Sequence, residues 1–186
     1  MSIFESIKEE VMTLNEQYMA NADDSYNFWE EHIKYVVQES LELSKTYGAD
    51  IEIVELAALL HDIALMAKVG VRSEHHVNGA NLAKNLLVKY KYPEEKSNKV
   101  VKCILNHRSS KNATSIEELC VADADILAHF DNILMLISNV VENSSSLQET
   151  RKKLRDAFEY DYNDLSDMTK KVFKKRYQTI CHVVLT

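Results

Sequence analysis

The chain has 186 residues, 46% of them apolar, so it is long enough to bury one core and too short for a second independent domain. Three glycines and one proline are too few for an architecture with many turns, and we therefore expect an all-α protein. A net charge of −7, from 22 basic and 29 acidic residues, excludes a broad basic surface, so duplex nucleic acid is not an expected partner.

The first predicted helix covers roughly residues 2–20 and should pack across the main body. Its apolar residues recur at alternating steps of three and four and form one stripe: Phe4, Ile7, Val11, Leu14 and Tyr18. Asp24 and Ser25 can then cap a second helix, which turns His32 toward the core and ends at Gly48.

A third helix should begin after Asp50 and lie in the buried middle of a bundle, because residues 56–60 have almost no polar face. His61 and Asp62 follow directly at its inner end. Adjacent residues on a helix differ in direction by about 100°. The two side chains can therefore reach one ion only if it lies between their two directions.

Two further helices should follow a loop that carries Gly70 and Arg72. Ser73 can cap the first of them, which contains His75, His76 and Gly79. Pro93 is in a good position to open the next, which ends near His107. The polar residues 108–114 should form a loop.

Ser115 and Glu118 have the spacing of a capping box, which predicts a sixth helix that runs through Asp123 and Asp125 to about Val141. The polar run 143–146 should end it. Two more helices, at about 147–160 and 166–184, should form a C-terminal hairpin against the core. We expect residues 1–186 to form one domain, with this extension at about 147–186.

The three cysteines, Cys103, Cys120 and Cys181, lie far apart and inside predicted helices, so we expect buried thiols in a reducing compartment. The N-terminal residues lack the basic flank and apolar stretch of a secretion signal. No apolar run approaches the ~20 residues of a membrane span. We therefore expect a cytoplasmic protein with no membrane partner.

Four side chains are candidate ligands of one divalent ion, which needs several imidazole or carboxylate donors within ~2.0–2.2 Å. They are His32, His61, Asp62 and Asp125. Any one of them alone would more commonly be a solvated or structural residue. An Asp beside a His after five apolar residues carries a large desolvation cost, however, and a cation is the simplest partner for both.

With these residues in place, the chain resembles the HD-domain superfamily of metal-dependent phosphohydrolases over about residues 24–141. The resemblance rests on the segments 32–36, 56–64, 75–80, 104–107 and 121–127. It implies a compact HD-domain-like helical bundle with the N-terminal helix and the C-terminal hairpin packed on it. It also implies that His32, His61, Asp62 and Asp125 hold the metal ion.

Asp123 competes with Asp125 for the last ligand position. Family members show apolar residues two and five positions after this ligand, and Leu127 and Phe130 satisfy that pattern from Asp125. We therefore choose Asp125. Asp123 would then be a hydrogen-bond acceptor behind a ligand or a residue on the helix surface.

His75 and His107 match the places at which family members with more than one metal bind the extra ions. Here they could hold a second ion, contact the substrate phosphate or cap helices. His76 should support a ligand or be exposed, and His129 and His182 have no motif context. The segment after His107 lacks the Gly-Tyr-Pro signature of the cyclic-dinucleotide enzymes, which argues against cyclic di-GMP as a substrate.

We expect a phosphohydrolase in which a metal-bound hydroxide cleaves a phosphomonoester or phosphodiester of a small molecule, with nucleotides as the favoured class. The residues expected to be catalytic are His61, Asp62, His75 and His107. Those expected to contact the phosphate are Lys68, Arg72, Arg108 and Lys111. The ion could be Mn, Fe, Co, Ni, Zn or Mg.

Two alternatives remain open. The chain could be a non-catalytic regulatory module that binds metal and nucleotide, because residues 63–65 offer no acid for the leaving group. It could also be a helical interaction protein whose ionisable residues are structural. The sequence also leaves a homodimer open.

Overall fold

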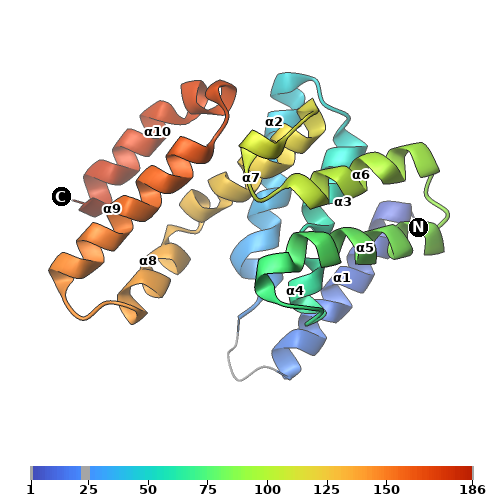
Figure 1. Ribbon diagram of the computed structural model, residues 1–186, viewed down its shortest axis with the longest axis horizontal. Coiled ribbons are helices and arrows are strands. Elements are labelled where there is room, and N and C mark those ends of the chain that lie inside the picture. Colours follow the sequence, from blue (N-terminus) through green and yellow to red (C-terminus); the bar gives the residue numbers. More distant parts are fainter. Residues whose placement is uncertain (1, 22–25, 186) are drawn as a thin grey trace.

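The computed structural model describes residues 2–21 and 26–185, and within these residues it contains helices and no strand. The all-α prediction is therefore confirmed (Figure 1). Within the same residues, no helix is long and apolar enough to cross a membrane. Cys103 and Cys120 are buried as predicted, whereas Cys181 is partly exposed, and all three are free thiols.

The N-terminal helix packs across the body as predicted. α1 spans Ile3–Ala20 and buries Ile7 and Val11 where it meets α3 and α4. A five-residue π-helix, Trp29–Ile33, then leads into α2, Lys34–Tyr47. α2 ends at Gly48, whose φ of 75° is the left-handed conformation that glycine adopts without strain. The predicted cap at Asp24 and Ser25 lies outside the described residues.

The central helix breaks at the predicted ligand pair. α3, Ile51–Leu60, starts as expected with the Asp50 carboxylate accepting from the Glu52 amide, and residues 56–60 are all buried. The chain leaves helical geometry at Asp62, with φ −104° and ψ 16°, before the short α4, Ile63–Met66. The relative direction of the His61 and Asp62 side chains is therefore set by this break and not by the regular helical step that we assumed.

Two paired helices follow α4; the first packs against α4 and the second against α3. A 3₁₀ turn, Arg72–Glu74, precedes α5, His75–Lys89, so the predicted Ser73 cap is wrong: Ser73 lies within the turn, and Glu74 occupies the cap position. α6, Glu94–Asn106, begins directly after Pro93 and ends before His107. The loop after it contains a short 3₁₀ turn, Ser110–Asn112.

The predicted sixth helix is in fact two helices. α7, Ile116–Asp131, starts with Ser115 accepting from the Glu118 amide and packs along α2. It stops at Asn132, and α8 continues over Ile133–Glu142. The side-chain amide of Asn132 donates to the backbone carbonyl and the carboxylate of Glu31, at 2.9 and 2.8 Å, and so ties this break to the π-helix.

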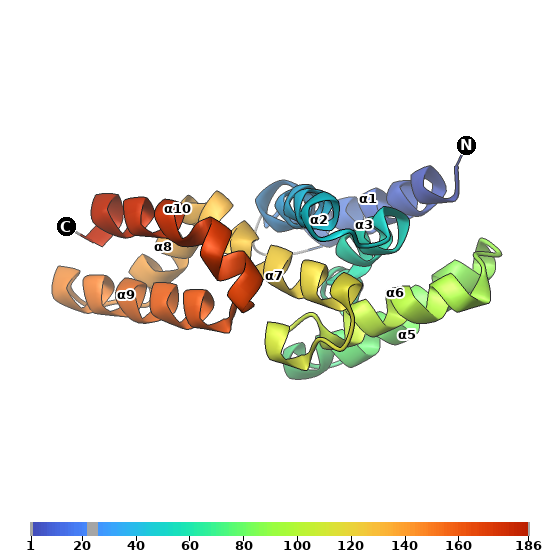
Figure 2. The same ribbon diagram turned by 90° about the horizontal axis from the view of Figure 1, so that it is seen from above.

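The C-terminal hairpin consists of α9, Leu147–Asp164, and α10, Asp167–Leu185. Figure 2 shows α8, α9 and α10 at the end of the molecule opposite α5 and α6, with α7 between them. The predicted packing on the core occurs where the hairpin meets α7. There, the Phe130 ring contacts those of Phe158 and Phe173, with centroids 5.6 and 5.1 Å away.

Candidate metal centre

Three histidines at helix ends share one hydrogen-bond arrangement. His61 and His107 cap the C-termini of α3 and α6, and His75 is the first residue of α5. Each Nδ1 lies within hydrogen-bond distance of a backbone carbonyl three residues earlier, at 2.7, 2.6 and 2.7 Å respectively. Because a carbonyl can only accept, Nδ1 carries the proton, and the Nε2 lone pair is free to bind a cation.

All four predicted metal ligands converge in one group. His32 comes from the π-helix, and its Nε2 lies 2.9 Å from Asp125 Oδ1 and 3.1 Å from His61 Nε2. Asp62 Oδ2 lies 3.6 Å from the same His61 atom and 3.9 Å from His32 Nε2. The π-helix, the break after α3 and the middle of α7 therefore position this donor group.

A second donor group adjoins the first and shares one of its members. His75 Nε2 and His107 Nε2 lie 3.0 Å apart, and Asp62 Oδ1 lies 3.4 Å from His75 Nε2. Asp62 therefore directs one carboxylate oxygen toward each group. Asp62 thus belongs to both groups of possible metal donors.

The donor set fits divalent ions. In the tautomer fixed by the two carbonyl contacts, the Nε2 atoms of His75 and His107 face each other as lone pairs, and a cation between them would turn this repulsion into attraction. Two ligands of one ion, each about 2.1 Å from it, can be at most about 4.2 Å apart. The distances from the Nε2 atoms given above, from 2.9 to 3.9 Å, satisfy this limit. Imidazole and carboxylate donors suit ions from Mn to Zn.

Electrostatics favours the protonation states that metal ligands need. Burial by itself would raise the pKa of Asp62, but the nearby His61 and His32 rings outweigh it and lower that pKa. Burial is likewise outweighed at Asp125, where a hydrogen bond from His32 holds the pKa far below its usual range. Burial lowers the pKa of His107 to about 4. At neutral pH both carboxylates are charged and His107 is neutral.

Asp123 lies away from both groups. Its side chain is fully buried and accepts hydrogen bonds from Ser110, Ser166 and Thr169, with donor distances between 2.5 and 2.9 Å. A position on the helix surface, which the sequence left open, is therefore wrong. Asp123 instead fixes the start of α10 to α7, while Asp125 is the aspartate that faces His32.

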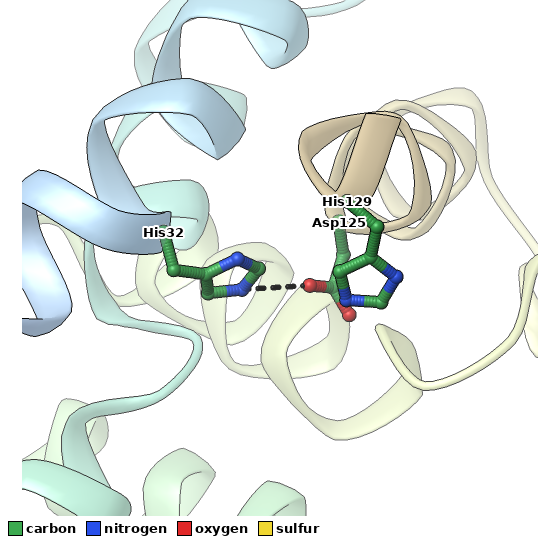
Figure 3. A group of neighbouring side chains, drawn as sticks. All are labelled: His32, Asp125 and His129. Atoms are coloured by element: carbon green, nitrogen blue, oxygen red, sulfur yellow. Dashed lines mark ion pairs between the residues drawn. The ribbon is translucent and has the colours of Figure 1, made fainter. Parts of the chain in front are cut away.

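His129 is a neighbour of the site that the sequence analysis missed. It follows Asp125 by four residues, and its ring stacks on His32 with centroids 5.8 Å apart (Figure 3). Its Nδ1 lies 3.0 Å from Asp161 Oδ2 of α9. The spacing of an aspartate and a histidine by four positions on one helix was a signal that could have indicated this contact.

A cleft of about 770 Å³ opens over both donor groups. Tyr18, Tyr26 and Phe28 line one part of it, and α8 contributes Met135, Leu136 and Asn139. Burial and the Asp62 charge raise the pKa of Tyr26 to about 12, so its hydroxyl keeps its proton.

Of the four basic side chains predicted to contact phosphate, two line the cleft and two make other contacts. Arg72 and Arg108 line the cleft. Lys68 lies over the Tyr18 ring, 4.9 Å from its centroid, and Lys111 pairs with Asp164 at 3.1 Å. His76 lines a second, smaller pocket together with Arg108.

The sequence is similar to a known family and to known proteins. The family model of the HD domain matches residues 29–129. Ribonuclease Y of Acetivibrio thermocellus is 37% identical over 81 residues, which are 44% of this chain and 14% of that protein. An uncharacterized protein of Clostridium beijerinckii is 26% identical over 87 residues, or 55% of its length. The chain thus spans less than two thirds of either relative.

Solved structures share the fold over nearly the whole chain. An HD-superfamily hydrolase from Bacillus thuringiensis has a TM-score of 0.70 at 19% identity, covering 97% of this chain and 94% of that one. A predicted HD superfamily hydrolase from an uncultured Thermotogales bacterium has a TM-score of 0.58 at 23% identity, covering 86% and 92%. The similarity extends to the C-terminal hairpin.

Proposed function

The chain belongs to the HD domain family, and from this premise we propose that it is a metal-dependent phosphohydrolase that cleaves a phosphomonoester or phosphodiester of a small molecule. Nucleotides are the proposed substrate class. The observation that carries the proposal is the position of Asp62, which directs one oxygen toward each of two histidine-containing groups at the floor of a cleft.

The donor groups assign residues to two ions. His32, His61, Asp62 and Asp125 would hold the first, and His75 and His107, with the second oxygen of Asp62, would hold the other. A bound divalent ion would acidify a coordinated water and polarise a phosphoryl oxygen. The carbonyl contacts at Nδ1 of His61, His75 and His107 keep these rings oriented for that purpose.

The rim of the cleft supplies the positive charge that a phosphate needs. Arg72 and Arg108 line it, and Arg108 uses one N–H group to donate to the Ser73 carbonyl at 3.0 Å. A guanidinium has five N–H donors, so the remaining ones can form a paired contact with phosphate oxygens. This contact would place the phosphorus near the donor groups.

The rest of the cleft suits a planar, partly polar group. Its volume of about 770 Å³ lies within the ~300–1,000 Å³ of small-molecule sites. Tyr26 and Phe28 offer aromatic surface, and Asn139 offers an amide on the α8 side. A nucleobase has both the flat face and the polar edge that such walls recognise.

The proposal predicts metal-dependent release of phosphate from a panel of nucleoside phosphates, aryl phosphomonoesters and aryl phosphodiesters. Asp62→Asn keeps the size of the side chain but removes the charge shared by both groups, so kcat/KM should fall at least about 100-fold. Asp156→Asn, the same change on the exposed surface of α9, is the matched control and should retain full activity.

Two results would contradict the proposal. The first is hydrolysis that is equal in Asp62→Asn and the wild type. The second is metal-dependent nucleotide binding without release of product from any member of the panel. That second result would favour the regulatory module, which the apolar residues 63–65 after Asp62 also suit because they supply no acid for a leaving group.

A further inference from the structure

His129 faces the first donor group from α7. It follows Asp125 by four residues, so the two side chains lie on the same side of this helix, opposite His32. One donor atom from each of His32, Asp125 and His129 lies within 4.8 Å of the others. Figure 3 shows the three side chains directed toward one region between the π-helix and α7.

The orientation of the His129 ring is fixed from outside the group. Its Nδ1 lies 3.0 Å from Oδ2 of Asp161, and a carboxylate oxygen accepts hydrogen bonds, so Nδ1 carries the shared proton. In Figure 3 the two ring nitrogens lie on opposite sides of the ring, one of them on the side of Asp125 and His32. In the neutral ring Nε2 therefore holds the lone pair and can bind a cation. Carboxylate, histidine and cation in this order form a common metal-binding relay.

We propose that His129 is a fifth protein donor to the ion held by His32, His61, Asp62 and Asp125, and that Asp161 is the positioning residue that orients it. The inference rests on the metal centre of the proposed function and adds a ligand to it. Asp161 belongs to α9, beyond the residues 29–129 that match the HD domain, so the C-terminal hairpin contributes to the centre.

The extra donor has a consequence for metal preference. Structural and catalytic zinc sites are usually four-coordinate. Five protein donors exceed that number and suit ions such as Mn, Fe, Co and Ni, which accept six ligands. The first site should therefore prefer these ions to zinc more strongly when His129 is present than when it is removed.

The test is a titration of metal-free protein with Co²⁺, followed by visible absorption and by X-ray absorption at the cobalt edge. A His75→Ala background removes a donor from the second group only and so isolates the first ion. In this background we compare His129→Ala, Asp161→Ala and Asp161→Asn. His182→Ala removes an imidazole from the exposed surface of α10 and is the matched control.

His129→Ala should weaken Co²⁺ binding at least 10-fold and remove one imidazole from the cobalt X-ray absorption signature, while His182→Ala changes neither. Asp161→Ala should weaken binding by about 10-fold because the ring loses its orientation. Asp161→Asn retains a hydrogen-bond acceptor and should recover most of the affinity. Circular dichroism checks that each variant is folded, and Asp161→Ala tests the same relay without removing the ligand itself.

The inference would be overturned if His129→Ala left both the Co²⁺ affinity and the number of imidazoles bound to cobalt unchanged. It would also be overturned if the substitution changed only the KM for substrate and not the binding of the metal. The outcome is separable from that of the proposed function because metal titration needs no turnover. An ion that depends on His129 in a protein that releases no phosphate would support this inference and contradict the hydrolase. Phosphate release by a protein whose metal affinity does not depend on His129 would contradict this inference and support the hydrolase.

Discussion

At the scale of single residues, two aspartates two positions apart on α7 have different roles. Asp125 faces His32 at 2.9 Å, whereas Asp123 is buried among the hydroxyl groups of Ser110, Ser166 and Thr169. The sequence favoured Asp125 through the apolar pattern that follows it. It could not show the partners of Asp123, because two of them lie more than forty residues further along the chain.

Asp123→Ala should destabilise the protein. The substitution leaves several buried donors without an acceptor, and each such loss costs about 1–3 kcal/mol. We expect the free energy of unfolding to fall by about 3 kcal/mol in urea denaturation, measured with a chelator so that ion binding does not contribute. Asp156→Ala on exposed α9 should change it by less than about 0.5 kcal/mol. A loss below about 1 kcal/mol in Asp123→Ala would show that the buried network is not a major anchor of α10.

At the scale of the elements, composition and capping patterns predicted most helices correctly. The caps at Asp50 and Ser115 and the stop at Gly48 were all confirmed, because each depends on a local preference of one residue type. The break at Asn132 was missed. No glycine or proline signals this break, and the hydrogen bonds of Asn132 to Glu31 are a long-range contact that the local sequence does not reveal.

The same distinction applies to the candidate site. The family pattern was sufficient to select four side chains that the fold brings together. The geometry at Asp62 was not predictable from helical periodicity, since the residue is not helical. The contribution of Asp161 was also missed, because only the folded hairpin brings α9 beside His129.

At the scale of the whole molecule, α7 joins the matched HD segment to the C-terminal hairpin. The Phe130 ring contacts, the hydrogen bonds of Asp123 and the His129–Asp161 pair all join α7 to this hairpin. Arg176 of α10 adds a fourth connection, since it pairs with Glu39 of α2 at 3.1 Å and also with Asp131 of α7. The hairpin therefore both lines the cleft and is anchored beside the metal centre.

The cluster of Glu39, Asp131 and Arg176 predicts that the stability of the protein depends on pH. Burial, and then the neighbouring Asp131, raise the pKa of Glu39 from 4.5 to about 7 despite the opposing effect of Arg176. Between about pH 4.5 and pH 7 the folded protein therefore holds a proton on Glu39 that the unfolded chain releases. The resulting contribution to stability is complete below about pH 4.5 and is lost as the pH rises to about 7.

Glu39→Gln removes that titration. The stability of the variant relative to the wild type should therefore rise between pH 5 and pH 7, by up to about 1 kcal/mol per pH unit, in parallel urea denaturation series. The other titrating groups are common to both proteins and cancel in the comparison. Parallel stability curves for the two proteins would contradict this account of the cluster.

The most direct test of the central claim, a metal centre organised by Asp62, is the metal content of freshly purified protein by elemental analysis, beside that of Asp62→Asn and Asp156→Asn. We predict about two transition-metal ions per chain in the wild type and in Asp156→Asn, with most of this metal lost in Asp62→Asn. The absence of metal from the wild type, together with no uptake when Mn²⁺, Co²⁺ or Zn²⁺ is added, would contradict the account.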